Sequence, residues 1–320
     1  MVIVSPFAKK RFVDHGDPKL GKSHLLLHCA AVISHGGEWP CREGSAPQGT
    51  VIILSAEDSP QDTLIPRLLA YGANLEKIKL IEAVRVAKGR RCFSLKEDLP
   101  NLERMIEELK DVVLVIIDPV SVFLGANGLS NVAVRRVLAP LAEMAERLQV
   151  AVCCITHSQK AKSKKAIHAF IDSIAFAATA RAAFLLLRDV EDKMRLLLLS
   201  AGNNLGKEPE GLAFRLLPCK VAGPDGDIET SVVTFESEFC DKSADEMIAL
   251  INDAGSKSAQ RDKAKDFLLK LLAGGVRVLA TDVQRQAEAA GFKYRTICTA
   301  KAELGVLSER EGDVWYWVLR

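Results

Sequence analysis

The sequence lacks a long apolar run, a cysteine pair at metal-binding spacing and a large net charge of either sign. No apolar stretch approaches the roughly 20 residues that a membrane-spanning helix needs, and even the run 174–187 is interrupted by Arg181. The eight cysteines include no C-x-x-C pair, which argues against a metal site and favours buried thiols in a reducing compartment. The net charge of +2 neither requires nor excludes nucleic acid as a partner.

The start of the chain also lacks the pattern of a secretory signal, because its apolar stretch is short and precedes the charged residues. No internal repeat or low-complexity tract is present. We therefore expect a cytoplasmic protein with no membrane segment. A chain of 320 residues has room for one large domain and a small one, or for two of medium size.

The most informative stretch is HGDPKLGKS at 15–23, which has the spacing of a phosphate-binding loop. Backbone N–H groups at the start of a helix form an anion site in such a loop, and an apolar helical run follows directly here. Lys22 is expected to reach the β- and γ-phosphates, and Ser23 is expected to hold Mg²⁺. The alternative is an incidental glycine turn. The expected nucleotide-binding residues are Gly16, Asp17, Pro18, Lys19, Leu20, Gly21, Lys22, Ser23 and His24.

The segment that follows alternates between strands and helices, which predicts a mainly parallel α/β sheet. Apolar strands are expected at 51–54, 80–84, 112–117 and 150–156, and helices at 60–71, 98–110 and 132–148. Four further strands, at 182–187, 195–200, 213–217 and 231–235, have only short connections. We expect these four to be antiparallel strands that extend one edge of the sheet.

Two acidic residues stand where parallel strands of the sheet end. Asp118 follows the strongest apolar strand and is expected to support Mg²⁺, but Pro119 after it cannot act as a base. Glu57, which closes the strand at 51–54, is the candidate for the base that activates water. The alternative is that Glu57 and Asp58 are a solvated pair that caps the next helix.

These motifs resemble those of RecA-like AAA-family ATPases, and more closely those of the family of the plasmid hexameric helicase RepA. The resemblance covers about residues 13–217 and rests on GDPKLGKS, VIILSAED, LVIIDP, VRRVLAPLAEMAERL, ITH and NNLG. It implies a RecA-like P-loop core that uses ATP and Mg²⁺ and assembles into a hexameric ring, with Glu57 as a catalytic residue. It also implies that His157 senses the γ-phosphate and that Arg181 is an arginine finger for the neighbouring subunit's nucleotide. The alternatives are a core histidine and an internal salt bridge.

Two positions depart from the family's pattern. Lys19 stands where a glycine is usual in the loop, and Gly202 replaces a lysine that commonly precedes the NNLG motif. Both departures predict slow hydrolysis. A basic connection follows His157, and in a ring its cations could contact the phosphates of a threaded DNA strand, although such a loop can also be merely solvated. Its lysines are Lys160, Lys162, Lys164 and Lys165.

The carboxyl-terminal part has a different pattern. We expect an ATPase domain at 1–236, a polar linker at 237–258 and a winged helix-turn-helix domain at 259–320, in which three helices precede a hairpin. The third helix would bury Ile297, Ala300 and Leu304 and present Lys293, Arg295 and Thr299 to a DNA groove. Related modules commonly carry arginines at the positions of Cys298 and Thr299, and winged helices also bind proteins.

The function predicted from the sequence is Mg²⁺-dependent ATP hydrolysis by a ring that binds or translocates along single-stranded DNA. The expected setting is plasmid, phage or mobile-element replication. One alternative is an ATP-gated DNA-binding regulator or loader with little unwinding activity. Another is an ATPase that assembles proteins and binds its partner through the winged helix.

Overall fold

The computed structural model describes residues 11–16, 20–86, 89–125, 131–157, 176, 179–204, 206–223 and 226–320. The chain divides into two compact units, Met1–Ile248 and Ala249–Arg320, and we describe each unit by itself. Among the described residues, no helix combines the length and apolarity that crossing a bilayer requires.

A nine-stranded sheet, counted over the described residues, forms the centre of the first unit in the order β11-β10-β9-β8-β1-β7-β6-β2-β3. The strands from β8 to β3 in this order are parallel to one another, whereas β9, β10 and β11 are antiparallel to their neighbours. The strands are β1 (Arg11–Gly16), β2 (Thr50–Ser55), β3 (Ile78–Ile81), β6 (Val112–Asp118), β7 (Ala151–His157), β8 (Ala182–Arg188), β9 (Leu196–Asn203), β10 (Leu212–Gly223) and β11 (Gly226–Phe235).

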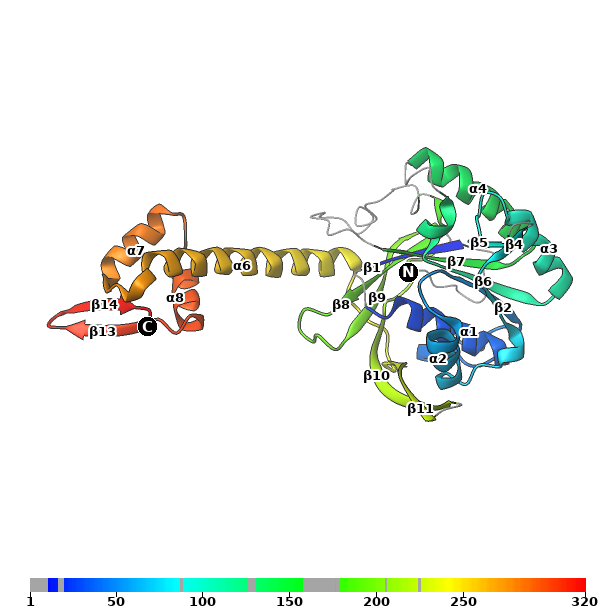
Figure 1. The fold of residues 1–320 in the computed structure, drawn as a ribbon, viewed down its shortest axis with the longest axis horizontal. Coiled ribbons are helices and arrows are strands. Elements are labelled where there is room, and N and C mark those ends of the chain that lie inside the picture. The colour runs from blue at the N-terminus through cyan, green and yellow to red at the C-terminus, as the bar shows by residue number, and fades with distance from the viewer. Residues whose placement is uncertain are drawn as a thin grey trace. The chain divides into compact units, whose positions relative to one another are not determined.

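Helices cover both faces of this sheet, with α1 and α2 on one face and α3 and α4 on the other (Figure 1). This coverage explains why β2 and β6 are almost continuously apolar and buried. A small ribbon, β4 (Val84–Val86) with β5 (Gly89–Arg91), lies outside the main sheet. The helices are α1 (Lys22–His35), α2 (Ile65–Ala70), α3 (Leu99–Leu109) and α4 (Asn131–Arg147).

The strand before the phosphate loop is the element that the sequence indicates most weakly. It is β1, which lies in the middle of the sheet between β7 and β8. The loop that follows β1 therefore opens at the carboxyl end of a central parallel strand, where open α/β sheets bind their ligands.

Two strand expectations are wrong in part. The strand expected at 80–84 is buried only in part: β3 is an edge strand that ends at Ile81, and Val84 begins the separate ribbon. The strand expected to be antiparallel at 182–187 is β8, which runs parallel to β1. More than a dozen residues connect β7 to β8, which is long enough for the crossover that a parallel pair requires.

The second unit contains most of α6 (Ala244–Leu271), followed by α7 (Ala280–Ala289) and α8 (Tyr294–Glu303). A three-stranded antiparallel sheet completes it, in the order β12-β14-β13. Its strands are β12 (Val278–Leu279), β13 (Leu307–Glu311) and β14 (Val314–Val318). The three helices and the terminal hairpin that were expected in this part of the chain are therefore present, the first of them as the end of α6. The core consists of Ala264, Leu268, Leu272, Val283, Ala287, Ile297, Ala300, Val306 and Trp317.

The segment 237–258, which was expected to be a polar linker, is helical from Ala244 onward. Ser243 and Glu246 form a reciprocal cap at the start of α6. The Ser243 Oγ accepts from the Glu246 backbone N–H at 3.2 Å, and the Glu246 carboxylate accepts from the Ser243 backbone N–H at 2.8 Å. Low apolar content therefore indicates solvent exposure here, and it does not indicate irregular backbone.

Candidate nucleotide-binding site

The start of α1 forms the floor of a pocket of about 420 Å³. Gly21 is the N-cap residue of α1, and no side chain caps this end of the helix. The first N–H groups of α1 therefore remain available to an anion, which the helix dipole also favours. The Lys22 side chain lines the same pocket although the residue is only 5% exposed, and an ammonium group so buried is stabilised by anionic partners.

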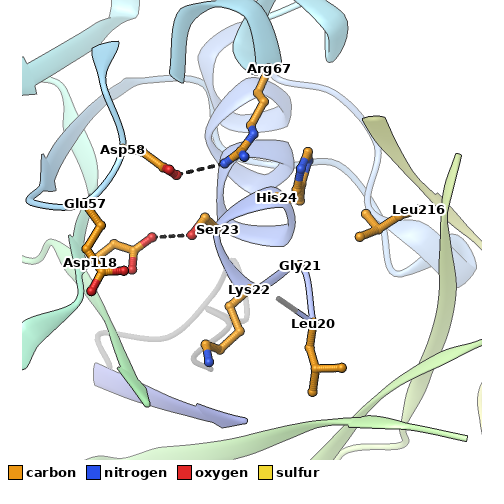
Figure 2. A pocket seen from close by; sticks show the side chains of 10 residues that line it. All are labelled: Leu20, Gly21, Lys22, Ser23, His24, Glu57, Asp58, Arg67, Asp118 and Leu216. Carbon is orange, nitrogen blue, oxygen red and sulfur yellow. Dashed lines mark hydrogen bonds and ion pairs between the residues drawn. The ribbon is translucent and has the colours of Figure 1, made fainter. Parts of the chain in front are cut away.

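The carboxyl ends of β2 and β6 bring two acidic side chains to this pocket. Ser55 pairs with Asp118 in the β2–β6 register, and the Ala56 backbone N–H donates to the Asp118 carbonyl at 3.1 Å. Glu57 follows at once, so it lines the pocket together with Asp118. Figure 2 shows the two carboxylates on the same side of the pocket. Glu57, Asp118 and Lys22 therefore line one pocket.

Asp118 is also joined to the phosphate loop. The Ser23 Oγ donates a hydrogen bond to the Asp118 Oδ2 at 2.5 Å. Burial raises the pKa of Asp118 to about 6, and the negative charges of Asp58 and Glu57 add to the rise, while Ser23 and Lys22 oppose it. A divalent cation would stabilise this cluster of carboxylates.

The donor set at this point fits Mg²⁺, which the resemblance implies. A hydroxyl oxygen and a carboxylate oxygen lie 2.5 Å apart at Ser23 and Asp118, and both are hard oxygen ligands. Mg²⁺ characteristically takes only one or two protein ligands beside phosphate oxygens and water. These two residues would therefore hold the ion between the loop and the end of β6.

Two pocket residues were not expected from the sequence. Arg67 of α2 lines the pocket, and its Nη1 lies 2.8 Å from the Asp58 Oδ2. The interpretation of Asp58 as a helix cap is wrong, because Ser59 is the N-cap residue and accepts from the Asp62 backbone N–H. Arg67 is the single basic residue between Ser59 and Tyr71. A lone arginine in the helix after an acidic pair was the available signal.

Leu216 of β10 is the second unexpected pocket residue. It lies against Gly21, which has φ of +83°. A Cβ atom at Gly21 would come within 2.7 Å of the Leu216 Cδ1, and the backbone conformation is one that side-chain-bearing residues rarely adopt. The backbone conformation therefore favours glycine at this position, and any side chain here would also displace the end of the Leu216 side chain.

His24 connects the phosphate loop to the antiparallel extension of the sheet. Its Nδ1 lies 3.2 Å from the Tyr71 hydroxyl, which in turn accepts from the Val233 backbone N–H at 3.1 Å. Burial, aided by Arg67, lowers the pKa of His24 to about 4. A neutral histidine thus joins α1 to α2 and β11 directly behind Ser23.

Arg181 does not reach this pocket. It is exposed, it precedes β8, and it makes no ion pair with any residue in the described part of the chain. The Arg181 carbonyl accepts from the Asn204 backbone N–H at 3.0 Å, so the NNLG motif lies beside it. Because β8 is parallel to β1, Arg181 lies at the amino edge of the sheet, whereas the pocket lies at the carboxyl edge.

Other predicted residues have a defined backbone or fall outside the described ranges. His157 ends β7 beside Gly16, and nothing further is described of its side chain. Asp17, Pro18 and Lys19 of the loop lie outside the described residues, as do Lys160, Lys162, Lys164 and Lys165. In the second unit, Ile297 and Ala300 are buried and Leu304 packs against them, as expected. Lys293, Arg295 and Thr299 are exposed.

The comparisons with known proteins agree with a nucleotide-binding unit. The family described as an AAA domain matches residues 7–163, a range that contains Lys22, Glu57 and Asp118. Among solved structures, the ATPase domain of G40P is similar with a TM-score of 0.49 and 13% identity, over 65% of this chain and 82% of that chain. No curated protein matches the chain.

The match to the AAA domain supports an ATPase. It ends before Arg181, β8 and the whole second unit, so it bears on the pocket and its strands alone. The structural likeness to the G40P domain is too small to carry an argument of its own. The case for ATP hydrolysis therefore rests on the geometry of the pocket.

Proposed function

We propose that the chain is a Mg²⁺-dependent ATPase with a RecA-like core that works as a ring, of hexameric type, on DNA. The observation that supports this most is the shared pocket, in which Lys22, Ser23, Asp118 and Glu57 meet at the carboxyl edge of a parallel sheet. These are the groups that phosphoryl transfer to water requires: an anion cradle, a cation ligand set and a base.

Each residue then has a distinct task. The N–H groups of α1 and the Lys22 ammonium bind the β- and γ-phosphates and offset the charge that develops on them. Ser23 and Asp118 hold Mg²⁺, which neutralises phosphate charge when bound. Glu57 is exposed at the end of β2, where it accepts a proton from the attacking water. Arg67 adds a further positive charge at the wall of the pocket.

Arg181 would complete the site of a neighbouring subunit. Seven residues of β8 separate the amino edge, where Arg181 lies, from the carboxyl edge, a distance of roughly 20 Å at about 3.3 Å per residue. An arginine that far from the pocket of its own chain cannot contact the same triphosphate. Its exposure suits an interface between subunits, and closing such head-to-tail contacts produces a ring.

The proposal that ATP hydrolysis is coupled to DNA binding rests mainly on the sequence. His157 would sense the γ-phosphate from the end of β7 next to Gly16, and the basic connection after it would contact the DNA. The second unit has the element order of a winged helix-turn-helix, with α8 in the place of the recognition helix. Partners in plasmid, phage or mobile-element replication belong to this proposal as well.

The hydrolytic part is tested by phosphate release from ATP with and without Mg²⁺. We expect turnover that EDTA abolishes and that Lys22→Ala reduces together with nucleotide binding. Lys96→Ala is the matched control, because Lys96 is exposed and lies outside the pocket. A Lys22 variant with unchanged turnover would remove the pocket from the mechanism.

An ATP-gated regulator or loader is the second candidate, and Gly202 favours it. Gly202 pairs with Ala183, close to Arg181 and the NNLG motif. The sheet edge that carries Arg181, and that would face a neighbouring subunit, therefore lacks the lysine that is common at position 202 in the family. A strand-displacement assay on a forked duplex separates the two candidates. A motor separates the strands when ATP is added, whereas a switch changes only its affinity for DNA.

A further inference from the structure

The second unit contains a groove of about 710 Å³ between α6 and the start of α8. Four of its lining residues are basic, one is acidic, and the remainder are polar apart from one alanine. No large apolar side chain lines the groove. Protein interfaces have apolar or aromatic centres, whereas nucleic-acid interfaces are polar and strongly positive. The lining therefore suits a polyanion. The basic residues are Lys257, Arg261, Lys293 and Arg295.

The positive charges come from two elements that are distant in sequence. Lys257 and Arg261 lie one turn apart on α6, Lys257 inside the segment predicted to be a linker and Arg261 just after it. Lys293 is the N-cap residue of α8, and no side chain caps that end of the ten-residue helix. The positive end of the α8 dipole therefore adds to the field of the four side chains.

The charges in the groove are incompletely neutralised. Lys293 and Arg295 make no ion pair with any residue that the structure describes. Lys257 pairs with Asp253 at 2.6 Å, but both side chains are largely exposed, so the pair screens little. Arg261 pairs with Glu303 at 3.2 Å through one Nη atom. Its buried Nε has no acceptor among the described residues.

Hydroxyl groups complete the lining and are donors that suit phosphate oxygens. Ser256, Ser258 and Thr296 line the groove beside the cations. Thr299 differs from them, because its hydroxyl already donates to the Arg295 carbonyl at 3.0 Å. Thr299 therefore has no proton left for a phosphate, and we do not count it among the contacts.

We propose that this groove binds backbone phosphates of a nucleic-acid strand and that α6 supplies half of the site through Lys257 and Arg261. The inference rests on the proposed action on DNA and adds a second, separate contact to it. It gives a binding role to Lys257, which lies in the segment predicted to be a polar linker, 237–258. It also requires Lys293 and Arg295 to act together with α6, and α8 alone would not suffice.

The test measures binding of the full-length chain to labelled single-stranded and duplex DNA of equal length, by fluorescence anisotropy between 50 and about 200 mM salt. The groove variants are Lys257→Gln with Arg261→Gln, and Lys293→Gln with Arg295→Gln. The matched control is Lys263→Gln with Lys270→Gln, which removes two exposed cations of α6 that do not line the groove. Circular dichroism melts check that every variant folds.

Each groove variant is expected to lose about tenfold or more in affinity and to reduce the salt slope by about two, while the control stays within about twofold of wild type. The DNA form that shows this loss is the form that the groove binds. Equal losses in the groove variants and the control would overturn the inference, as would unchanged affinity in the groove variants. ATP turnover without DNA is measured in parallel. A wild type that hydrolyses ATP but binds neither DNA form overturns both the inference and the DNA part of the proposed function, and leaves the ATPase.

Discussion

Individual side chains decide what this pocket can do, and the sequence predicted the most important of them. Lys22 and Ser23 are positioned by a local motif, and Asp118 and Glu57 by the rule that parallel strands end at one edge of a sheet. Arg67 and Leu216 could not be predicted in this way. They reach the pocket through the packing of α2 and β10, which depends on contacts far apart in the chain.

His28 gives a prediction about pH and stability. Burial, with a smaller effect of nearby His35, lowers the pKa of His28 from 6.5 to about 4. The unfolded chain therefore binds a proton between these pH values that the folded chain does not, so the unfolding free energy falls as the pH is lowered through this window. Urea denaturation at pH 7 and pH 5 should show a decrease about 2 kcal/mol larger in wild type than in His28→Gln. Parallel decreases in the two proteins would contradict this assignment.

Among the elements, those with a strong local pattern were predicted and those set by topology were not. The apolar run of β6 and the amphipathic pattern of α4 are legible in the sequence. The direction of β8 depends on the path of the preceding connection, which no local pattern encodes. The helical start of α6 was predictable in principle, because Ser243 and Glu246 have the spacing of a capping box.

Tyr71 joins three elements, and this gives a prediction about stability. Tyr71→Phe keeps the ring contact with His28, whose centroid lies 5.4 Å away, but it removes the hydroxyl that links His24 and the Val233 N–H. Leaving these buried groups without their partner should cost about 1–3 kcal/mol in unfolding free energy. Tyr294→Phe, at an exposed tyrosine, should change it by no more than about 0.5 kcal/mol. Equal effects in chemical denaturation would show that the hydroxyl is dispensable.

At the scale of the whole molecule, the proposed mechanism requires several copies of the chain to assemble. Arg181 and the pocket lie at opposite edges of one sheet, so a single chain cannot use both at the same nucleotide. The proposal that the site is divided between subunits comes from the family resemblance. The direction of β8, which puts Arg181 at the edge away from the pocket of its own chain, supports this proposal.

Mixing two inactive variants tests whether the site is shared. Glu57→Gln and Arg181→Ala should each have little turnover alone. In an equimolar random mixture, about one quarter of head-to-tail interfaces join an intact Arg181 to a pocket with an intact Glu57. Turnover should therefore rise toward about one quarter of the wild-type value. A mixture that shows only the mean of the two variants would contradict the proposal that Arg181 completes a neighbouring subunit's site.

The central claim is that Glu57 acts on water beside a triphosphate held by Lys22 and Ser23. The most direct measurement compares ATP turnover and Mg²⁺-dependent ATP binding in wild type, in Glu57→Gln and in Glu82→Gln, an exposed acid that follows the neighbouring strand β3. Turnover should fall by about 100-fold or more in Glu57→Gln while binding is retained, and Glu82→Gln should match wild type. Undiminished turnover in Glu57→Gln would contradict the account.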